Sequence, residues 1–182
     1  MAGIYARTQL MRRLGLRNGD STPAGGLDHR LPPNRNETSL THYDAMLEQE
    51  AMTADVPVEL LKAICWYASG WRQYEPSGRV LSTPAAQGTS YGCMQLNDVW
   101  HPDAFPSAMH NAQSSVAYAA RLLRWLYEQT DDWHRASIAF FGHDRRAENA
   151  ARRVRKYADQ QPWLQRQETE ARSEPPLVGH RS

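Results

Sequence analysis

The stretch that decides the fold is DVPVELLKAICWYASGW, residues 55–71. Its apolar residues recur every three or four positions, which predicts one amphipathic helix over residues 57–69. Pro57 suits the first helical position, and Glu59 lies in the first turn, where the helix dipole favours a carboxylate. Gly70 is predicted to end the helix. These end signals place Ala68 on the last turn, at the inner tip of a buried helix.

Further helices are predicted on both sides of this stretch. Asn111 is an N-cap candidate for a long helix through Tyr127, and Asp131 or Asp132 is predicted to cap the helix after it. The predicted flanking helices cover about 41–54, 111–127, a segment ending near Gly142, and 147–158, which has a basic face.

Residues 71–96 are different, because Gly and Pro recur between short alternating pieces. This pattern is typical of turns and short strands, and it predicts a small β-ribbon or loop excursion. The expected fold class is therefore mainly α, with one β excursion at about 71–96 that directly follows the buried helix.

Length and composition fit one globular domain. The chain has 182 residues, 41% hydrophobic and 23% charged, with a net charge of +1. This is enough for one core and too little for two comfortable domains. The balanced charge argues against a nucleic-acid partner, and no apolar run is long enough for a membrane span. We expect an arm over 1–40, one domain over 41–170 and a loose tail over 171–182.

The cysteines and histidines give no support for a metal or cofactor. Cys65 and Cys93 are too few for a zinc site, and we expect two small buried side chains, with a mutual disulfide as the alternative. The histidines show no ligand spacing such as His-Glu-x-x-His. The prediction is therefore no metal and no cofactor.

Two motifs resemble the core of lytic transglycosylases. In that family the helix reads Val-Pro, two variable residues, Leu-Leu, x-Ala-Ile, and then Glu-Ser-Gly-Trp, and residues 56–71 follow this pattern closely. The second motif is a Gly-x-Met-Gln turn, which is Gly92-Cys93-Met94-Gln95 here. A third, an Ala-x-Tyr-Asn helix end, is degraded at Phe141 and Gly142. Over about residues 42–160 the chain is similar to the lytic transglycosylase (SLT domain) and goose-type lysozyme-like family, which implies a lysozyme-like helical domain.

The main departure from the family pattern is Ala68, which stands where the family has its essential glutamate. A glutamate at a buried helix end is desolvated, so its pKa rises and it can protonate the leaving glycosidic oxygen. The resemblance implies that the same group then removes the proton of the muramic acid 6-hydroxyl, which attacks internally. In goose-type lysozymes water is the nucleophile. Alanine can do neither step.

Three explanations of Ala68 are open. In the first explanation, the chain is an inactivated Glu→Ala variant of an enzyme that cleaves the MurNAc-GlcNAc β-1,4 bond of peptidoglycan as a lytic transglycosylase or muramidase. Alternatively, it is a natural pseudoenzyme that serves as a non-cleaving peptidoglycan-binding module. In the third explanation another carboxylate, such as Glu75 or Asp98, acts instead.

The resemblance also implies substrate-binding positions around residue 68. The amides of Gln95 and Asn97 are expected to bond N-acetyl groups, and Tyr91, Phe140 and Phe141 to stack on sugar rings. An ordinary strand end and an ordinary core are the alternatives, and Ser69 has a helix-capping alternative. The expected site consists of Ala68 with Ser69, Tyr91, Gly92, Met94, Gln95, Asn97, Phe140 and Phe141.

Peptidoglycan glycan strands are the expected partner, and the periplasm or cell wall is the expected place of action. The N-terminal sequence lacks the continuous apolar stretch of a Sec signal. This predicts export by a specialised secretion system or a phage route, or a signal removed from the chain, with an immunity or secretion-system partner in the effector case. The basic residues between 145 and 156 are expected to form a solvated face, with stem-peptide carboxylates as the alternative.

Overall fold

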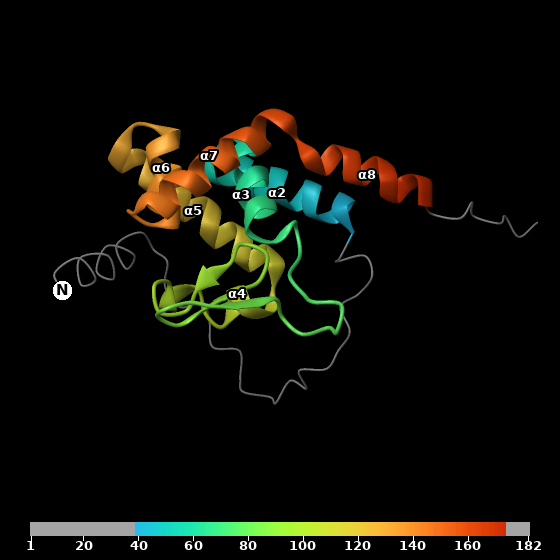
Figure 1. Cartoon of the computed structure of the whole chain (residues 1–182), viewed down its shortest axis with the longest axis horizontal. Helices are drawn as coiled ribbons and strands as arrows, with labels where there is room; N and C mark the ends of the chain where they lie inside the picture. The colour runs from blue at the N-terminus through green and yellow to red at the C-terminus, as the bar shows by residue number, and fades with distance from the viewer. Residues whose placement is uncertain (1–38, 174–182) are drawn as a thin grey trace, which may run out of the picture.

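The computed structural model describes residues 39–173, which form a helical body with a small sheet attached below it (Figure 1). Apart from residues 39 and 40, the expected arm lies outside the described residues, as does the expected tail beyond residue 173. The helices are α2 (Leu40–Ala54), α3 (Val58–Ser69), α4 (Ser107–His110), α5 (Ala112–Thr130), α6 (Trp133–Phe141), α7 (Arg145–Gln160) and α8 (Pro162–Ser173), with a 3₁₀ turn, η2 (Pro102–Ala104).

The helix ends follow the capping residues in the sequence. Asn111 accepts a hydrogen bond from the backbone N–H of Ser114 at 2.8 Å and begins α5, as predicted. Of the two candidates for capping α6, Asp132 is the N-cap, whereas Asp131 closes α5 with a φ of 51°. Gly70 ends α3 with a φ of 64°, a conformation that glycine adopts without strain.

The β excursion is a three-stranded antiparallel sheet in the order β1-β2-β3. β1 (Ser82–Pro84) pairs with β2 (Thr89–Tyr91), and β2 pairs with β3 (Leu96–Asn97). The excursion predicted over 71–96 is confirmed, and it extends one residue further, to the end of β3. In Figure 1 this sheet lies beside α4, at the end of the molecule away from α7 and α8.

Helix α3 lies at the centre of the core, in contact with α2 on one side and α7 on another. Leu61, Ile64 and Cys65 are completely buried. The spacing of apolar residues predicted no helix at α8. One apolar side chain anchors it, since Trp163 stacks on Trp71 with ring centroids 5.4 Å apart. A helix with a single apolar anchor on a polar background leaves little periodic signal.

A buried lysine fixes α3 against α2. Lys62 is 7% exposed, and its Nζ lies 2.6 Å from Asp44 Oδ1 and 2.7 Å from Glu48 Oε1. Burial lowers the pKa of Lys62, but the hydrogen bonds to the two carboxylates outweigh it, and the pKa is raised overall. The ammonium therefore stays charged and holds the N-terminal half of α3 in place.

The two cysteines are buried and unpaired. Cys65 Sγ lies 3.6 Å from the backbone oxygen of Cys93, so the two residues are neighbours without a bond between the sulfurs. Burial, with the proximity of Cys93, raises the pKa of the Cys65 thiol well above its ordinary value. A thiol that stays protonated is a poor nucleophile. The expected pair of small buried side chains is confirmed, and the alternative disulfide is not formed.

Candidate active site

The last turn of α3 opens into a cavity of about 860 Å³. Ala68 is half-buried and is one of the residues that line this cavity, so position 68 is not enclosed in solid protein. The cavity is lined by Tyr67, Ala68, Thr83, Ala85, Ser90, Met94, Gln95, Leu96, Asn97, Trp100, His101, Ala139, Phe140, Phe141, Gly142, His143 and Asp144.

Three separate parts of the chain meet around the cavity. They are the end of α3, the stretch 83–101 containing the sheet, and the stretch 139–144 that joins α6 to α7. These are the locations of the three motifs singled out in the sequence. The fold therefore brings the Ala-Ser-Gly-Trp turn, the Gly-x-Met-Gln turn and the degraded helix end into one site.

Some of the residues that the sequence assigned to the site line the cavity in the structure, and others do not. Met94, Gln95, Asn97, Phe140 and Phe141 line the cavity together with Ala68. The three others are not among the lining residues: Ser69, Tyr91 and Gly92.

Each of those three residues has a structural role close to the site. Ser69 Oγ donates to the backbone oxygen of Cys65 at 3.2 Å and accepts from the backbone N–H of Arg72 at 3.0 Å, which is its capping alternative. The ring of Tyr91 packs edge-to-face against Phe105, with centroids 5.7 Å apart. Gly92 has a φ of 70° and lies directly against a buried glutamine.

That glutamine is Gln73, which is 1% exposed and was not identified from the sequence. Its Oε1 accepts from the backbone N–H of Cys93 at 2.9 Å, and its Nε2 donates to the backbone oxygens of Ala108 and Met109 at 3.2 and 2.7 Å. Gln73 thus connects the Gly-x-Met-Gln turn to α4. Its sequence neighbours are polar loop residues, so nothing in the pattern marks it as buried.

The two amide side chains expected to bind N-acetyl groups differ in how many of their hydrogen-bonding groups are already engaged within the protein. Asn97 Oδ1 accepts from the backbone N–H groups of Val99 and Trp100, and its Nδ2 donates to the backbone oxygen of Gln87 at 2.9 Å. Both lone pairs of Oδ1 are therefore occupied. Gln95 donates one Nε2–H to the backbone oxygen of Gly92 at 2.9 Å. Its Oε1 and second Nε2–H leave it the better equipped of the two for a ligand.

Aromatic side chains line two sides of the cavity. Phe141 packs edge-to-face on Tyr67 and on Phe140, with ring centroids 5.3 Å apart in both pairs. Trp100 was not identified from the sequence, yet it lines the cavity and remains 44% exposed. An exposed indole at the edge of a cavity is a suitable surface for a sugar ring. The sequence signal that could have identified Trp100 is its position three residues after Asn97, a residue already assigned to the site.

Besides Tyr67, three titratable side chains line the cavity: His101, His143 and Asp144. His101 is 8% exposed, and its Nδ1 lies 3.5 Å from the hydroxyl of Tyr118. Asp144 is exposed and caps α7, since its Oδ1 accepts from the backbone N–H groups of Arg146 and Ala147 at 3.0 and 2.9 Å.

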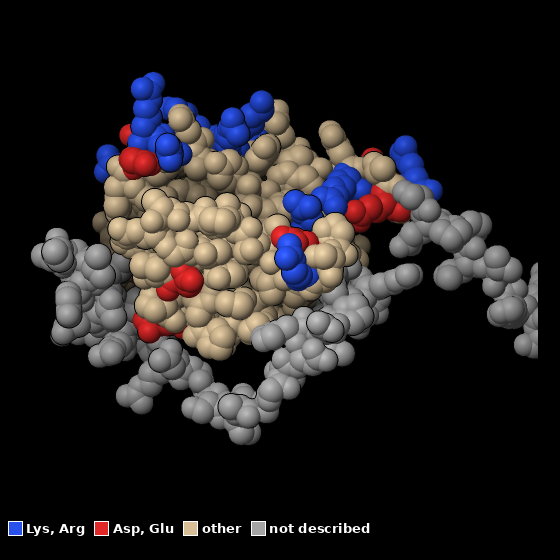
Figure 2. All heavy atoms as spheres, turned by 60° about the horizontal axis from the view of Figure 1, so that its bottom comes forward, with Lys and Arg blue, Asp and Glu red and all other residues tan. Residues whose placement is uncertain are grey.

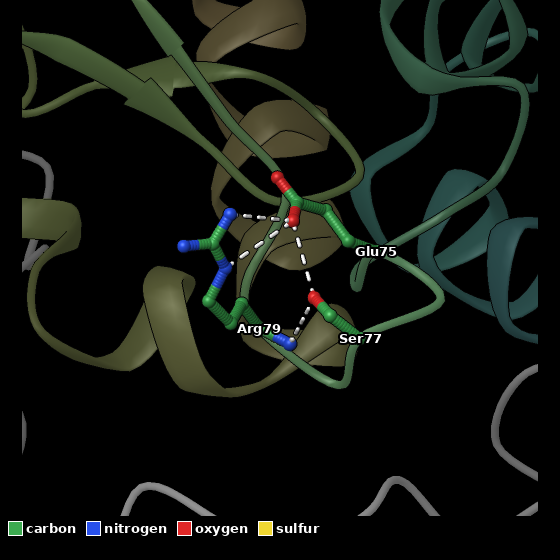
Figure 3. A network of polar contacts seen from close by, with 3 residues as sticks. All are labelled: Glu75, Ser77 and Arg79. Atoms are coloured by element: carbon green, nitrogen blue, oxygen red, sulfur yellow. Dashed lines mark hydrogen bonds and ion pairs between the residues drawn. The ribbon is translucent and has the colours of Figure 1, made fainter.

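The two carboxylates named as alternative acids lie outside the lining. Glu75 Oε2 is held by Ser77 at 3.2 Å and by Arg79 Nη2 at 3.1 Å, as Figure 3 shows. Asp98 Oδ1 accepts from the backbone N–H of Thr89 at 2.8 Å. Both carboxylates therefore have partners within the β excursion and not at the cavity.

Within residues 39–173, no group of three or more His, Cys, Asp or Glu side chains is arranged to hold a metal ion. None of the helices in this part of the chain combines the length and apolar content needed to cross a membrane.

A family model described as the transglycosylase SLT domain matches residues 45–162. Neither curated proteins nor solved structures gave a match. The matched region covers more than half of the chain and includes every residue that lines the cavity. The chain therefore belongs to the transglycosylase SLT domain family, the peptidoglycan lytic transglycosylase type of protein that acts in the periplasm or cell wall.

Proposed function

We propose that the cavity holds a peptidoglycan glycan strand and that residue 68 is the position from which a glutamate cleaves its MurNAc-GlcNAc β-1,4 bond. The observation that carries this proposal is the place of Ala68, half-buried at the end of α3 and open to the cavity. With alanine there, the chain binds the strand without cleaving it, as an inactivated Glu→Ala variant.

The local environment of residue 68 suits a general acid. Phe140 and Phe141 line the same cavity, and apolar neighbours favour the protonated form of a carboxyl group. A protonated glutamate can donate to the leaving oxygen and then act as base toward the 6-hydroxyl or a water molecule. The proposal needs no metal or second carboxylate.

No carboxylate in the described part of the cavity is suited to replace this acid. Glu75 and Asp98 do not line it, which argues against the third explanation of Ala68. Asp144 lines it, but this side chain is exposed and already accepts two backbone hydrogen bonds as the cap of α7. A carboxylate that is exposed and engaged in capping a helix is poorly placed to donate to a bound glycosidic oxygen.

The decisive experiment is Ala68→Glu, with Ala68→Gln as the matched control. Both side chains have nearly the same size, and only glutamate can give up a proton. We expect Ala68→Glu to degrade purified sacculi at least about 10²-fold faster than the parent chain or Ala68→Gln. Anhydro-muropeptide products would identify a transglycosylase, and reducing ends a hydrolase.

If Ala68→Glu folds, binds sacculi and releases no soluble product, the proposed position of the acid is wrong. A circular dichroism spectrum matching that of the parent chain establishes that the variant is folded. Binding of chitooligosaccharide to both variants, measured by calorimetry, separates loss of binding from loss of chemistry.

The second candidate function is a natural peptidoglycan-binding module that does not cleave. The observation that favours it is the intact support of the cavity, including the buried Gln73 contacts, in a chain without the acid. This candidate predicts equal sacculus binding with Ala or Glu at position 68 and no turnover with either. The gene sequence is an independent check, since a native glutamate codon contradicts it.

Delivery to the cell wall is a further part of the proposal. We expect export by a specialised secretion system or a phage route, or by a signal removed from the chain, and an immunity partner in the effector case. Export of the native protein that continues when the Sec machinery is inhibited would support the first two routes. Loss of export under that treatment would contradict them.

A further inference from the structure

Helix α7 carries a concentration of positive charge that the proposed reaction does not use. Over Arg145–Gln160 it contains six basic and two acidic residues, a net charge of +4, whereas the whole chain has +1. All six basic side chains are exposed. We call these residues the basic face: Arg145, Arg146, Arg152, Arg153, Arg155 and Lys156.

Charge is unevenly distributed over the described surface. Figure 2 shows Lys and Arg gathered along one edge of that view, while the broad face turned to the viewer carries few charged side chains. Within residues 39–173, the ion pairs involve Lys62, Arg79, Arg124 and Arg166, and none involves the basic face. Its cations are therefore available to an external anion.

The position of these cations is not explained by the stability of α7. Arg145 and Arg146 lie in the first turn, where the helix dipole disfavours positive charge. The opposite side of the helix is buried through Ala147, Ala150 and Val154, so packing is provided by small apolar residues. The core therefore does not require positive charge at these positions.

The helix begins at the cavity. Its N-cap, Asp144, and the preceding His143 are lining residues, so Arg145 and Arg146 follow directly on the cavity edge. Arg145, Arg152 and Lys156 recur at spacings of seven and four residues, which places them on one stripe of the helix. This stripe runs about 16 Å away from the cavity.

We propose that the basic face of α7 binds the carboxylates of peptidoglycan stem peptides while the glycan strand lies in the cavity. This inference rests on the proposed function. Stem peptides are attached to the muramic acid sugars of the same strand and carry several carboxylates. They therefore lie beside a bound strand, and their charge is complementary to that of the basic face.

The chemistry of α7 favours this partner over a membrane surface. Interfacial helices combine basic residues with exposed Trp, Phe or Leu that enter the bilayer. Helix α7 exposes no such residue, because its exposed side chains are Arg, Lys, Glu, Asn, Asp and Gln. A partner that offers carboxylates without an apolar phase fits these side chains better.

The test compares Arg152→Gln/Lys156→Gln with a control pair, Arg121→Gln/Arg135→Gln, which removes two exposed cations from α5 and α6. The chain keeps Ala68, so binding is measured without turnover. The ligands are sacculi free of teichoic acid, the same glycan strands after amidase removal of stem peptides, and vesicles containing anionic phospholipid. Melting temperatures establish that both variants are folded.

We expect the α7 variant to bind intact sacculi about 3- to 10-fold more weakly at low salt, with the difference shrinking as salt is raised. Its binding to peptide-free strands should remain within about 2-fold of the parent chain, as should binding of the control pair to both.

Equal loss on intact and peptide-free strands would overturn the inference, as would vesicle binding that matches sacculus binding and disappears in the α7 variant. The result is also separable from the proposed function. If the parent chain does not bind peptide-free strands, the cavity proposal fails, and the simultaneous binding of strand and stem peptide fails with it. If peptide-free strands bind and the α7 variant behaves like the parent chain on intact sacculi, only this inference fails.

Discussion

The two walls of the cavity are held in different ways. The helical wall consists of Tyr67 and Ala68 on α3 with residues 139–142 at the end of α6, and it is held by ring packing such as that of Phe141 on Tyr67. The β wall, residues 83–97, is held by hydrogen bonds from buried amide groups, above all those of Gln73.

The residues that line the cavity are therefore distinct from the residues that hold its β wall in position. Residue 68 is half-buried and open to the cavity, so the fold does not depend on what stands there. Gly92 and Gln73 do not line the cavity, yet they fix the position of the turn that does. Stability is therefore expected to be sensitive behind the β wall and tolerant at residues that line the cavity, and substitutions at Gly92, Gln73 and Trp100 test this contrast.

The largest effect on stability is expected for Gly92→Ala. A Cβ at this position would lie 2.6 Å from Gln73 Oε1, and the φ of 70° disfavours any side chain. Strain and clash together should lower the free energy of unfolding by about 3 kcal/mol. A thermal unfolding scan should show the melting temperature falling by about 8 °C.

Gly70→Ala is the matched control for that substitution. Gly70 has a similar φ of 64°, but its added Cβ would meet only Arg166 Nη1 at 3.8 Å, an ordinary contact. Backbone strain alone should cost about 1 kcal/mol. Equal losses for the two variants would show that contact with Gln73 does not hold the β wall.

A smaller loss, about 2 kcal/mol, is expected for Gln73→Leu, because the backbone N–H of Cys93 loses its buried acceptor. Chemical denaturation should show the lower free energy of unfolding. Gln113→Leu is the control, since Gln113 bonds Glu50 at an exposed site and should change stability little. If the Gln73→Leu chain is as stable as this control, Gln73 does not hold the β wall in place.

The smallest effect is expected for Trp100→Ala, and it concerns binding instead of stability. Trp100 is 44% exposed at the edge of the cavity, so removing the indole leaves the core unchanged. Loss of one stacking surface should weaken chitooligosaccharide binding about 5-fold, measured by calorimetry. A large drop in melting temperature with unchanged affinity would reverse the assignment of Trp100.

Much of the fold could be predicted from short-range signals. Asn111 and Gly70 mark helix ends because their side chains, or the lack of one, act on backbone groups within a few residues. For the same reason Asp132 caps α6. The β excursion was visible through its Gly and Pro residues. Helix α8 was missed because its one anchor, Trp163, is meaningful only beside Trp71.

The candidate site was partly predictable for a similar reason. Ala68, Met94 and Gln95 lie in compact motifs, and each lines the cavity. His143 and Thr83 also line it, but neither belongs to a motif, and their nearness to residue 68 follows from how distant segments pack. Conversely, Gly92 belongs to a motif and does not line the cavity, since its role is to lie against Gln73.

The sequence by itself determined helices α2, α3, α5, α6 and α7, the β excursion and the absence of a carboxylate at position 68, because these depend on residues close together in the chain. Only the tertiary structure decided that α3, the sheet and the start of α7 share one cavity. It alone also decided that Gln73 is buried and that Cys65 and Cys93 stay unbonded. The physical reason is that burial and distance between remote residues are set by the packing of whole elements, which local spacing does not encode.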